Sequence, residues 1–371
     1  MNKIVIFAAM LLVLFFGFQF QDGDVKTKDV VDFAVNSVMG DEGNFEDFEE
    51  EEVEVAEADE AEANNDDLEI LAFGDVMLGR YVRTLMDEND KDYIFENLGE
   101  VPELYPEADL VFANLEGPIQ GTGRSGGTAM VFSFNEDVAP FLKEEGFDLV
   151  SIANNHATDM GWGGRATTMT ALNEAGVGFC GHPSEADPES VYYGKAGKST
   201  YAFVCFNDIK YNLPQEDAVK LVQSVASMVD YTVISIHWGH EYELRPDNKL
   251  QVEPAHEFID AGADLIIGHH PHVVQGFEVY NDRFIFYSLG NFVFDQYWAQ
   301  MVQWELGIGV SLSGDNNDLK TTVKLFPIKS ENSQVRLMNE EERAKWIEDF
   351  ILYGTYSDEM AAMIREGEVM L

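Results

Sequence analysis

The segment Ser151–Gly161, SIANNHATDMG, places several polar side chains directly after the apolar run FDLV. The run predicts a buried strand, and the residues that follow Gly161 have a helical pattern. The polar side chains therefore lie at the exit of a strand, where open α/β sheets bind their ligands. They are Asn154, Asn155, His156 and Asp159. Asn and Asp also cap ordinary strand-to-helix turns, so the segment alone leaves both interpretations open.

Four further apolar runs end in side chains that carry oxygen or imidazole nitrogen. Their exits are Gly74-Asp75, Asn114–Glu116, His237–Gly239 and His269–His272. One such loop is common, but five in one chain are hard to attribute to chance. Oxygen and imidazole donors without thiolates suit Mn²⁺, Fe, Zn²⁺ or Mg²⁺. They outnumber the ligands of one tetrahedral ion, which predicts two divalent metal ions.

The order of apolar runs predicts the fold class. Strand-like and helix-like segments alternate from residue 68 to about residue 275, and the later runs alternate as antiparallel strands do. We therefore expect an α/β protein tending towards α+β, with a two-sheet β-sandwich flanked by helices, over residues 68–332. Residues 333–371 predict a helical tail whose apolar stripe docks on the core. The stripe is Trp346, Ile347, Phe350 and Ile351.

The first 67 residues predict where the protein is located rather than how it folds. Residues 1–20 carry Lys3 and then an apolar run that is just long enough for a membrane anchor and also fits a signal peptide. Because no small-x-small cleavage site follows, an uncleaved single-pass anchor is favoured, with the main domain extracytoplasmic; cleavage would make the protein secreted. Residues 21–67 are crowded with Asp and Glu, which predicts a disordered acidic tether.

Composition narrows the function classes. The 371 residues include 68 acidic and 23 basic ones, for a net charge of −45. Nucleic acid is excluded as an expected partner, because phosphate backbones select for Lys and Arg. Cys180 and Cys205 are compatible with a disulfide or with two buried thiols. The chain has no phosphate-binding P-loop. Its GxSxG match, GRSGG at residues 123–127, lies in a glycine-rich loop before a strand-like run and not at a strand-to-helix turn, so it does not predict a nucleophile elbow.

Six sequence blocks add a resemblance to a known family. They are GDVMLGR, NLEGP, SIANNHATDMG, IHWGHEYE, IIGHHPHVVQG and YSLGNFVF, and the resemblance that they carry covers about Leu68 to Ile328. Together they resemble the bacterial capsule and poly-γ-glutamate synthesis (CapA) family, and their ligand order resembles the calcineurin-like metallophosphoesterases. The resemblance implies a role in making, exporting or attaching an anionic polymer, with other capsule-synthesis proteins as partners. It also implies metal-assisted hydrolysis or transfer at a phosphate ester.

The resemblance assigns roles to particular residues. It implies metal ligands at Asp75, Glu116, Asn155, His237, His270 and His272. It implies that His156 contacts phosphate or protonates the leaving group. Asp159 is a candidate for orienting His156, and Glu241 is a candidate ligand, base or carboxylate behind the ligands.

One position departs from the pattern. Calcineurin-like enzymes have an imidazole where this chain has Met77, and a thioether is a poor ligand for a hard ion. The first metal site is therefore expected to be weak, rebuilt or empty. Arg80 is expected to meet an anionic substrate or to pair at the surface, and Asn291 to approach the site. Two alternatives to the polymer enzyme stay open: a general metallophosphoesterase of nucleotides or cell-wall phosphates, and a non-catalytic metal-binding scaffold for polymer export.

Overall fold

The protein was analysed as a computed structural model that describes residues 67–120, 130–210, 212–314 and 318–371. Residues Ala63–Leu371 belong to one compact unit, and the account below concerns that unit. The predicted anchor and nearly all of the predicted tether lie outside the described residues. Within the described ranges, no helix has both the length and the hydrophobicity needed to cross a bilayer.

The first sheet has nine strands. They are β1 (Leu68–Val76), β2 (Leu110–Leu115), β3 (Leu149–Ser151), β4 (Gly178–Cys180), β11 (Asn291–Val293), β12 (Trp304–Ser313), β13 (Lys320–Glu331), β14 (Gln334–Leu337) and β15 (Glu368–Met370). Their order is β14-β13-β12-β1-β2-β3-β4, with β11 beside β1 and β15 beside β13. The half from β1 to β4 is parallel and the half from β12 to β15 is antiparallel.

The second sheet has six strands, in the order β5-β6-β7-β8-β10-β9. They are β5 (Val191–Ala196), β6 (Ser199–Asn207), β7 (Tyr231–His237), β8 (Leu265–His269), β9 (Val274–Tyr280) and β10 (Arg283–Leu289). The four central strands are parallel, and β5 and β9 pair antiparallel at the two edges. Both sheets thus contain a run of parallel strands whose carboxyl ends emerge together.

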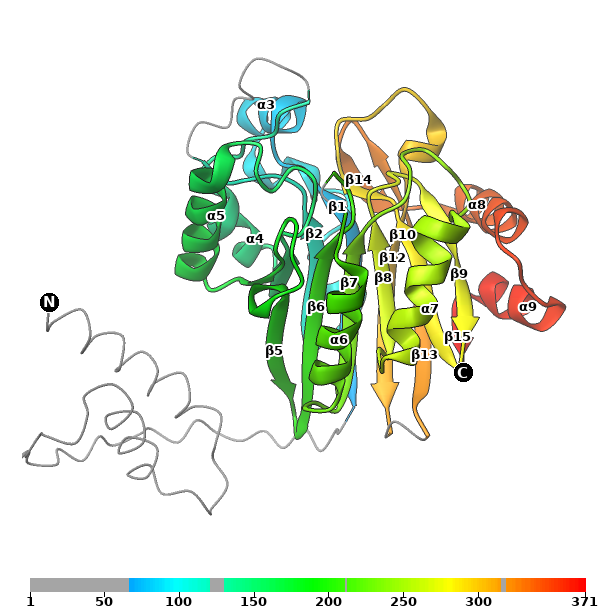
Figure 1. Ribbon diagram of the computed structural model, residues 1–371. Helices are drawn as coiled ribbons and strands as arrows, with labels where there is room; N and C mark the ends of the chain where they lie inside the picture. The colour runs from blue at the N-terminus through cyan, green and yellow to red at the C-terminus, as the bar shows by residue number, and fades with distance from the viewer. Residues whose placement is uncertain (1–66, 121–129, 211, 315–317) are drawn as a thin grey trace, which may run out of the picture. The chain divides into compact units, whose positions relative to one another are not determined.

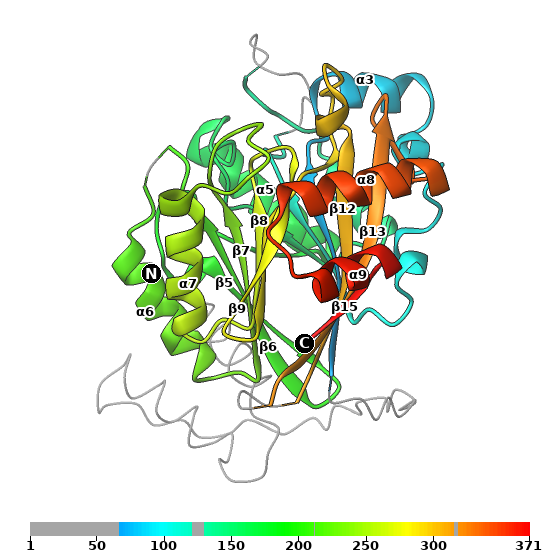
Figure 2. The same cartoon turned by 90° about the vertical axis from the view of Figure 1, so that its right-hand side faces the viewer.

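Helices flank the two sheets (Figure 1). They are α3 (Arg80–Glu88), α4 (Val138–Glu144), α5 (Gly161–Ala175), α6 (Gln215–Ala226), α7 (Glu253–Asp260), α8 (Glu340–Tyr353) and α9 (Asp358–Glu366). Short helical turns lie at Lys91–Ile94, Val101–Leu104, Pro188–Ser190, Asn248–Val252 and Gln300–Val302. Apolar residues of α3, α4 and α5 pack on the first sheet, and those of α6 and α7 pack on the second. The side view in Figure 2 shows α8 and α9 together on a different flank from α6 and α7.

The main core lies between the sheets, where alternate side chains of both inner faces meet. Phe112 of β2 and Phe203 of β6 are fully buried there, with ring centroids 4.8 Å apart. Burying a ring of this size contributes about 1.5–3 kcal/mol relative to leaving it exposed. Cys180 of β4 and Cys205 of β6 form a disulfide, so a covalent bond also joins the two sheets.

Strand register brings the exits together. Asp75 pairs with Asn114 on β2 and with Asn291 on β11, and His237 on β7 pairs with His269 on β8. The approach of β11 requires Gly74, because a Cβ there would lie 1.9 Å from the carbonyl oxygen of Gly290. The carboxyl ends of both parallel runs therefore form one edge of the sandwich.

The predicted α/β fold, with two sheets flanked by helices, is confirmed. The C-terminal tail differs in content from the expectation. Its two helices are present, but the residues around them also supply β14 and β15 to the first sheet. Both strands are short and lie beside the long strand β13, so their formation depends on that neighbour more than on a pattern of their own.

Candidate metal centre

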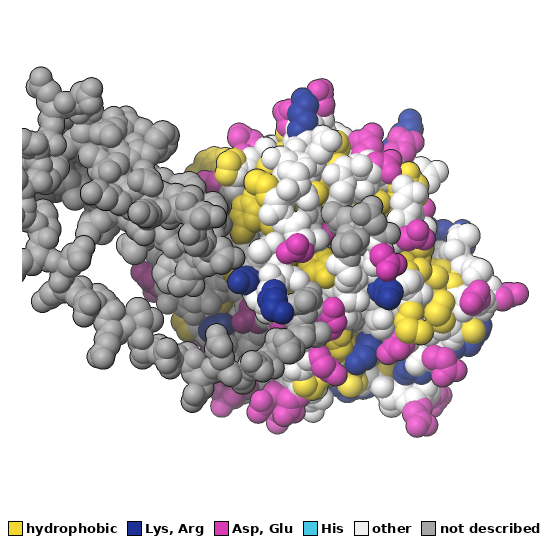
Figure 3. Space-filling model, turned by 90° about the horizontal axis from the view of Figure 1, so that it is seen from below, with side chains coloured by type: hydrophobic (Ala, Val, Ile, Leu, Met, Phe, Trp, Pro, Cys, Tyr) yellow, Lys and Arg dark blue, Asp and Glu magenta, His cyan; other side chains and the backbone are white. Residues whose placement is uncertain are grey.

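All six predicted ligands come together at the carboxyl edge of the two sheets. From the first sheet, Asp75 lies at the end of β1, Glu116 directly follows β2, and Asn155 lies in the loop after β3. From the second sheet, His237 ends β7, and the pair His270 and His272 follows β8. This edge is at the top of Figure 1, close to α3. Figure 3 views the molecule from below, so it faces the other end of the sheets. No histidine shows there on the surface that grey atoms leave visible.

Three of these side chains already have the spacing of ligands around one ion. Asn155 Oδ1 lies 2.9 Å from His237 Nε2, and His237 Nε2 lies 3.2 Å from His270 Nδ1. Ligand atoms bound at about 2.0–2.2 Å lie roughly 3.0–3.5 Å from one another around a metal ion. The amide oxygen and two imidazoles therefore fit a shared cation.

The two imidazoles are also in the right protonation state. Burial lowers the pKa of His270 to about 3, and the neighbouring His272 acts in the same direction. Burial and the neighbouring His270 hold the pKa of His237 well below its ordinary value. Both rings are therefore neutral near pH 7, and a neutral imidazole has a lone pair for a metal.

Asp75 is a buried carboxylate held from several sides. Asn114 donates its Nδ2 to Asp75 Oδ1 at 2.8 Å, and the backbone N–H of His270 reaches Oδ2 at 3.3 Å. His269 and His272 place their Nδ1 atoms 3.5 and 3.3 Å from the two oxygens. Burial alone raises the pKa of Asp75, but these imidazoles outweigh it and hold the pKa well below the ordinary value. Asp75 is therefore ionised in the folded protein.

Glu116 gives the sharpest test of whether a cation fits. Its side chain is fully buried, and neither carboxylate oxygen has a hydrogen-bond partner among the described residues. The nearest imidazoles are those of His156 and His272, whose Nε2 atoms lie 3.7 and 3.9 Å from Oε1. Burial raises the pKa of Glu116 well above the ordinary value, and the charge of His272 only partly offsets this. A buried carboxylate left without partners is expected where a metal ion completes the site.

His272 faces both carboxylates. Its Nδ1 lies 3.0 Å from Asn291 Oδ1, and its Nε2 points towards Glu116. Burial lowers the pKa of His272, but Glu116 and Asp75 outweigh burial and raise it to about 9. His272 Nε2 is therefore positioned to ligate beside Glu116 once its proton is displaced, while Nδ1 faces Asp75.

His156 and Asp159 form a pair beside the predicted ligands. His156 Nδ1 lies 2.7 Å from Asp159 Oδ2, which also accepts the backbone N–H of Phe132 at 2.7 Å. The Phe132 ring stacks on His156 with centroids 3.8 Å apart. This arrangement fixes the imidazole and leaves Nε2 directed towards Glu116. The geometry is the one expected if Asp159 orients His156.

Glu241 lies at the exposed rim of the centre. One of its carboxylate oxygens and ring nitrogens of His270 and His272 all lie within 4.8 Å of one another. Asp75, Glu116 and His237 form a second group with the same spacing. The two groups together accommodate either one or two cations.

Met77 belongs to a hydrophobic core cluster. Its fully buried side chain belongs to the core between the first sheet and α3–α5, and its sulfur accepts the backbone N–H of Gly79 at 3.3 Å. At the position where calcineurin-like enzymes have an imidazole, this chain therefore has a buried thioether. Asp75, Glu116 and His272 are the predicted ligands that remain on this side of the centre.

Three asparagines organise the ligands. Asn114 contacts Asp75, accepts Asn154 Nδ2 at 3.1 Å, and has its own Nδ2 3.4 Å from His237 Nδ1. Asn154 accepts the backbone N–H of His156 at 3.2 Å, which agrees with a loop-shaping role. Asn291 approaches the site as predicted, through His272. The sequence signal for Asn114 was its place in the strand exit NLEG, but nothing there distinguished it from a turn residue.

Arg80 has a partner of its own. Its guanidinium forms an ion pair with Asp295 and lies 4.9 Å from the centroid of the Phe132 ring. Arg80 is thus paired, but with a largely buried carboxylate and not at the surface as expected, and its contact with an anionic substrate stays a prediction. Asp295 lies between β11 and β12, so this ion pair ties that loop to the start of α3.

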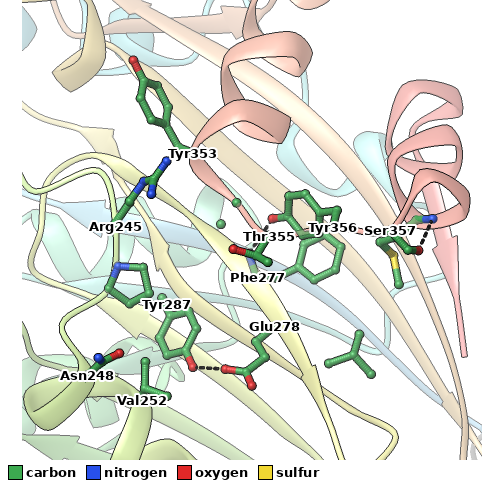
Figure 4. A pocket seen from close by; sticks show the side chains of 15 residues that line it. Arg245, Asn248, Val252, Phe277, Glu278, Tyr287, Tyr353, Thr355, Tyr356 and Ser357 are labelled. Atoms are coloured by element: carbon green, nitrogen blue, oxygen red, sulfur yellow. Dashed lines mark hydrogen bonds between the residues drawn. The ribbon is translucent and has the colours of Figure 1, made fainter.

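A large cavity lies apart from the predicted ligands. It has a volume of about 620 Å³ and lies between β9, the turn Asn248–Val252 and the α8–α9 connection (Figure 4). Tyr287 donates its hydroxyl to Glu278 at 2.5 Å in its wall, and Tyr356 accepts the backbone N–H of Phe277 at 2.9 Å. None of the predicted metal ligands lines this cavity.

A family model described as "Bacterial capsule synthesis protein PGA_cap" matches residues 69–296. The chain belongs to this family. The matched region begins in β1 and ends just after β11, so it contains all of the predicted ligands.

Curated relatives agree with the family assignment. The PGA biosynthesis protein CapA of Bacillus subtilis (strain 168) is 32% identical over 274 residues, which cover 68% of this chain and 71% of that protein. The capsule biosynthesis protein CapA of Bacillus anthracis is 31% identical over 269 residues, 65% of this chain and 64% of that protein. The match thus spans slightly less than two thirds of the B. anthracis relative. A crystal structure of a novel phosphatase from Mycoplasma pneumoniae overlaps 72% of this chain at 14% identity and a TM-score of 0.46, a similarity too low to argue from.

Proposed function

We propose that this member of the capsule synthesis family is a divalent-metal-dependent phosphoesterase that acts in the production of a capsule polymer. The observation that carries the proposal is the convergence of six oxygen and imidazole donors from five strand ends, one of which is the carboxylate of Glu116 that has no hydrogen-bond partner among the described residues. Such donors suit Mn²⁺, Fe, Zn²⁺ or Mg²⁺. A site of this composition at the carboxyl edge of parallel strands favours chemistry over structural support.

In the proposed cleavage of a phosphate ester, the metal-binding residues and His156 have different roles. Asn155, His237 and His270 would hold one cation, and Asp75 and Glu116, which group with His237, would contribute carboxylate oxygens to the centre, with His272 beside them. When bound, divalent cations supply charge stabilisation at the phosphoryl oxygens and lower the pKa of an attacking water. His156, held by Asp159, places Nε2 at the edge of the centre, where it can donate a proton to the departing alkoxide.

The proposal includes the predicted setting of the reaction. The main domain would work outside the cytoplasm, held to the membrane by residues 1–20, and would meet a phosphate ester linked to an anionic polymer. Other capsule-synthesis proteins would be its partners. The names of the curated CapA relatives, which refer to capsule and PGA biosynthesis, support the polymer part of this setting.

One observation favours a second candidate, a metal-binding scaffold for polymer export. With Met77 in the core, the Asp75 side of the centre lacks one imidazole of the calcineurin-like pattern. A centre that binds a single cation through Asn155, His237 and His270 would serve a scaffold equally well. The two candidates differ in turnover and not in metal binding.

The test measures metal content and turnover in the same preparations. The full chain is loaded with Mn²⁺, its metal content is determined by elemental analysis, and the hydrolysis of aryl phosphomonoesters and diesters is followed. Asn155→Ala and His270→Ala are expected to lose metal and turnover together. The control is His256→Ala on α7, because His256 pairs with Glu278 outside the centre. Metal binding without turnover would establish the scaffold, and full metal content in Asn155→Ala and His270→Ala would overturn the ligand assignment.

A further inference from the structure

An aromatic corner stands at the rim of the predicted metal centre. Tyr242, from the loop after β7, has its ring centroid 6.0 Å from that of His272. Trp298, from the loop between β11 and β12, meets Tyr242 edge-to-face, with centroids 4.8 Å apart and an angle of 88° between the planes. Trp298 is 59% exposed although it is one of the largest apolar side chains. The loop that carries it rises at the top of Figure 1, the same edge as the predicted ligands.

Hydrogen bonds connect this corner to the predicted ligand His272. Gln296 donates Nε2 to the Tyr242 hydroxyl at 3.1 Å, and Asn291 donates Nδ2 to Gln296 Oε1 at 3.2 Å. Asn291 Oδ1 in turn lies 3.0 Å from His272 Nδ1. The ring of Tyr242 and the imidazole of His272 are therefore fixed relative to each other.

The backbone of Tyr242 is fixed as well. Its φ of 67° lies in the left-handed region, which bulky residues rarely adopt. Its N–H donates to the carbonyl oxygen of Pro271 at 2.8 Å, and Pro271 lies between the two predicted ligands of the His270–His272 segment. A bulky residue held in such a conformation beside a site points to a functional constraint on that side chain.

We propose that Tyr242 and Trp298 form a stacking subsite that receives a ring on the alcohol side of the phosphate ester, an inference that rests on the proposed phosphoesterase function. The two ring planes stand at a right angle, so they make a corner that suits one rigid ring better than a flexible chain. An exposed indole gains most from a flat apolar face laid against it. The preferred substrates are therefore phosphate esters of cyclic alcohols, glycosyl or aryl, and not of linear ones.

The test compares the affinities of ring-bearing and linear ligands for the Mn²⁺-loaded full chain by calorimetry. The ligands are inorganic phosphate, butylphosphonate, phenylphosphonate and a non-hydrolysable hexose 1-phosphonate. The protein variants are wild type, Trp298→Ala, Trp298→Phe and Tyr193→Ala, the last replacing an exposed aromatic residue on β5 outside the corner. Loss of one aromatic contact corresponds to about a fivefold change in affinity.

Wild type and Tyr193→Ala are expected to bind at least one ring-bearing ligand about fivefold more tightly than butylphosphonate. Trp298→Ala should lose that preference while its affinity for inorganic phosphate stays unchanged, and Trp298→Phe should recover most of it. Dependence on Trp298 for the hexose ligand alone would identify a glycosyl substrate, and for the phenyl ligand alone an aryl one. A ring preference unchanged in Trp298→Ala, or absent from wild type, would overturn the subsite. Failure of wild type to bind inorganic phosphate would instead overturn the phosphoesterase proposal.

Discussion

Replacing Glu116 by glutamine is expected to stabilise the metal-free protein while weakening its response to metal. Glu116 is buried, both of its oxygens lack hydrogen-bond partners among the described residues, and burial raises its pKa. A polar group buried in this way costs about 1–3 kcal/mol of folding free energy, and a charged one costs more. Glu116→Gln keeps the shape of the side chain and removes the charge.

The size of the effect follows from the size of the domain. Unfolding a domain of about 300 residues has an entropy of roughly 0.6 kcal/mol/K, so a gain of about 1–3 kcal/mol raises Tm by roughly 2–5 °C. Mn²⁺ at a hundredfold excess over Kd adds about 2.7 kcal/mol to the wild type, or roughly 4 °C. If the variant binds a hundredfold more weakly, the same Mn²⁺ concentration adds only about 0.4 kcal/mol, which is less than 1 °C.

The assay is thermal unfolding of the full chain with a chelator and with Mn²⁺. Glu305→Gln is the matched control, because Glu305 on β12 is also fully buried without partners and is not one of the predicted ligands. It should raise Tm without metal and leave the Mn²⁺-induced shift intact. A lower Tm for Glu116→Gln in the presence of chelator, or a full Mn²⁺ shift in that variant, would refute the assignment of Glu116 as a ligand.

Three further expectations concern affinity, pH and the disulfide. Asn291→Ala removes a partner of His272 Nδ1 and should weaken Mn²⁺ binding about 10–100-fold in a metal titration. Burial raises the pKa of Glu305 well above 4.5, so its protonated form favours folding at low pH and wild-type stability falls as pH rises from that value. In urea unfolding at pH 5, 6 and 7, the wild type should lose unfolding free energy relative to Glu305→Gln at a rate approaching about 1.4 kcal/mol per pH unit. Parallel pH profiles of the two proteins would contradict this expectation. Cys180→Ala/Cys205→Ala opens a loop with a sequence separation of 25 and should cost about 3.5 kcal/mol, and a reductant should lower wild-type stability to the same level.

The sequence predicted the carboxyl-edge positions of the site because parallel strands leave few alternatives. An apolar run followed by Asn, His or Asp predicts a strand exit, and parallel exits share one edge of a sheet. Asp75, Asn155 and His237 all lie where this reasoning placed them. The helical tail was predicted less completely, since β14 and β15 form only because β13 lies beside them.

The details that depend on side-chain direction could not be predicted. Met77 is one residue beyond the end of β1, and only the packing of α3–α5 determines that it points into the core. Asn114 looks like a turn residue in sequence, yet its amide joins Asp75, Asn154 and His237. Contacts of this kind join residues from different strands, so they depend on sheet order, and a local pattern does not contain that order.

The backbone of the predicted ligand loop shows that side-chain identity there is not set by local conformational preference. His270 and His272 have φ of 95° and 57°, whereas most of the described non-glycine residues have negative φ. Asn281 and Asp282 also have positive φ, but they form a hairpin turn between β9 and β10, where such residues are expected. Imidazole side chains in this conformation cost about 1–3 kcal/mol each. Glycine would adopt these angles without strain but would remove the imidazole. The folded protein therefore has a conformational free-energy cost at the two positions where the predicted metal centre has these imidazole nitrogens.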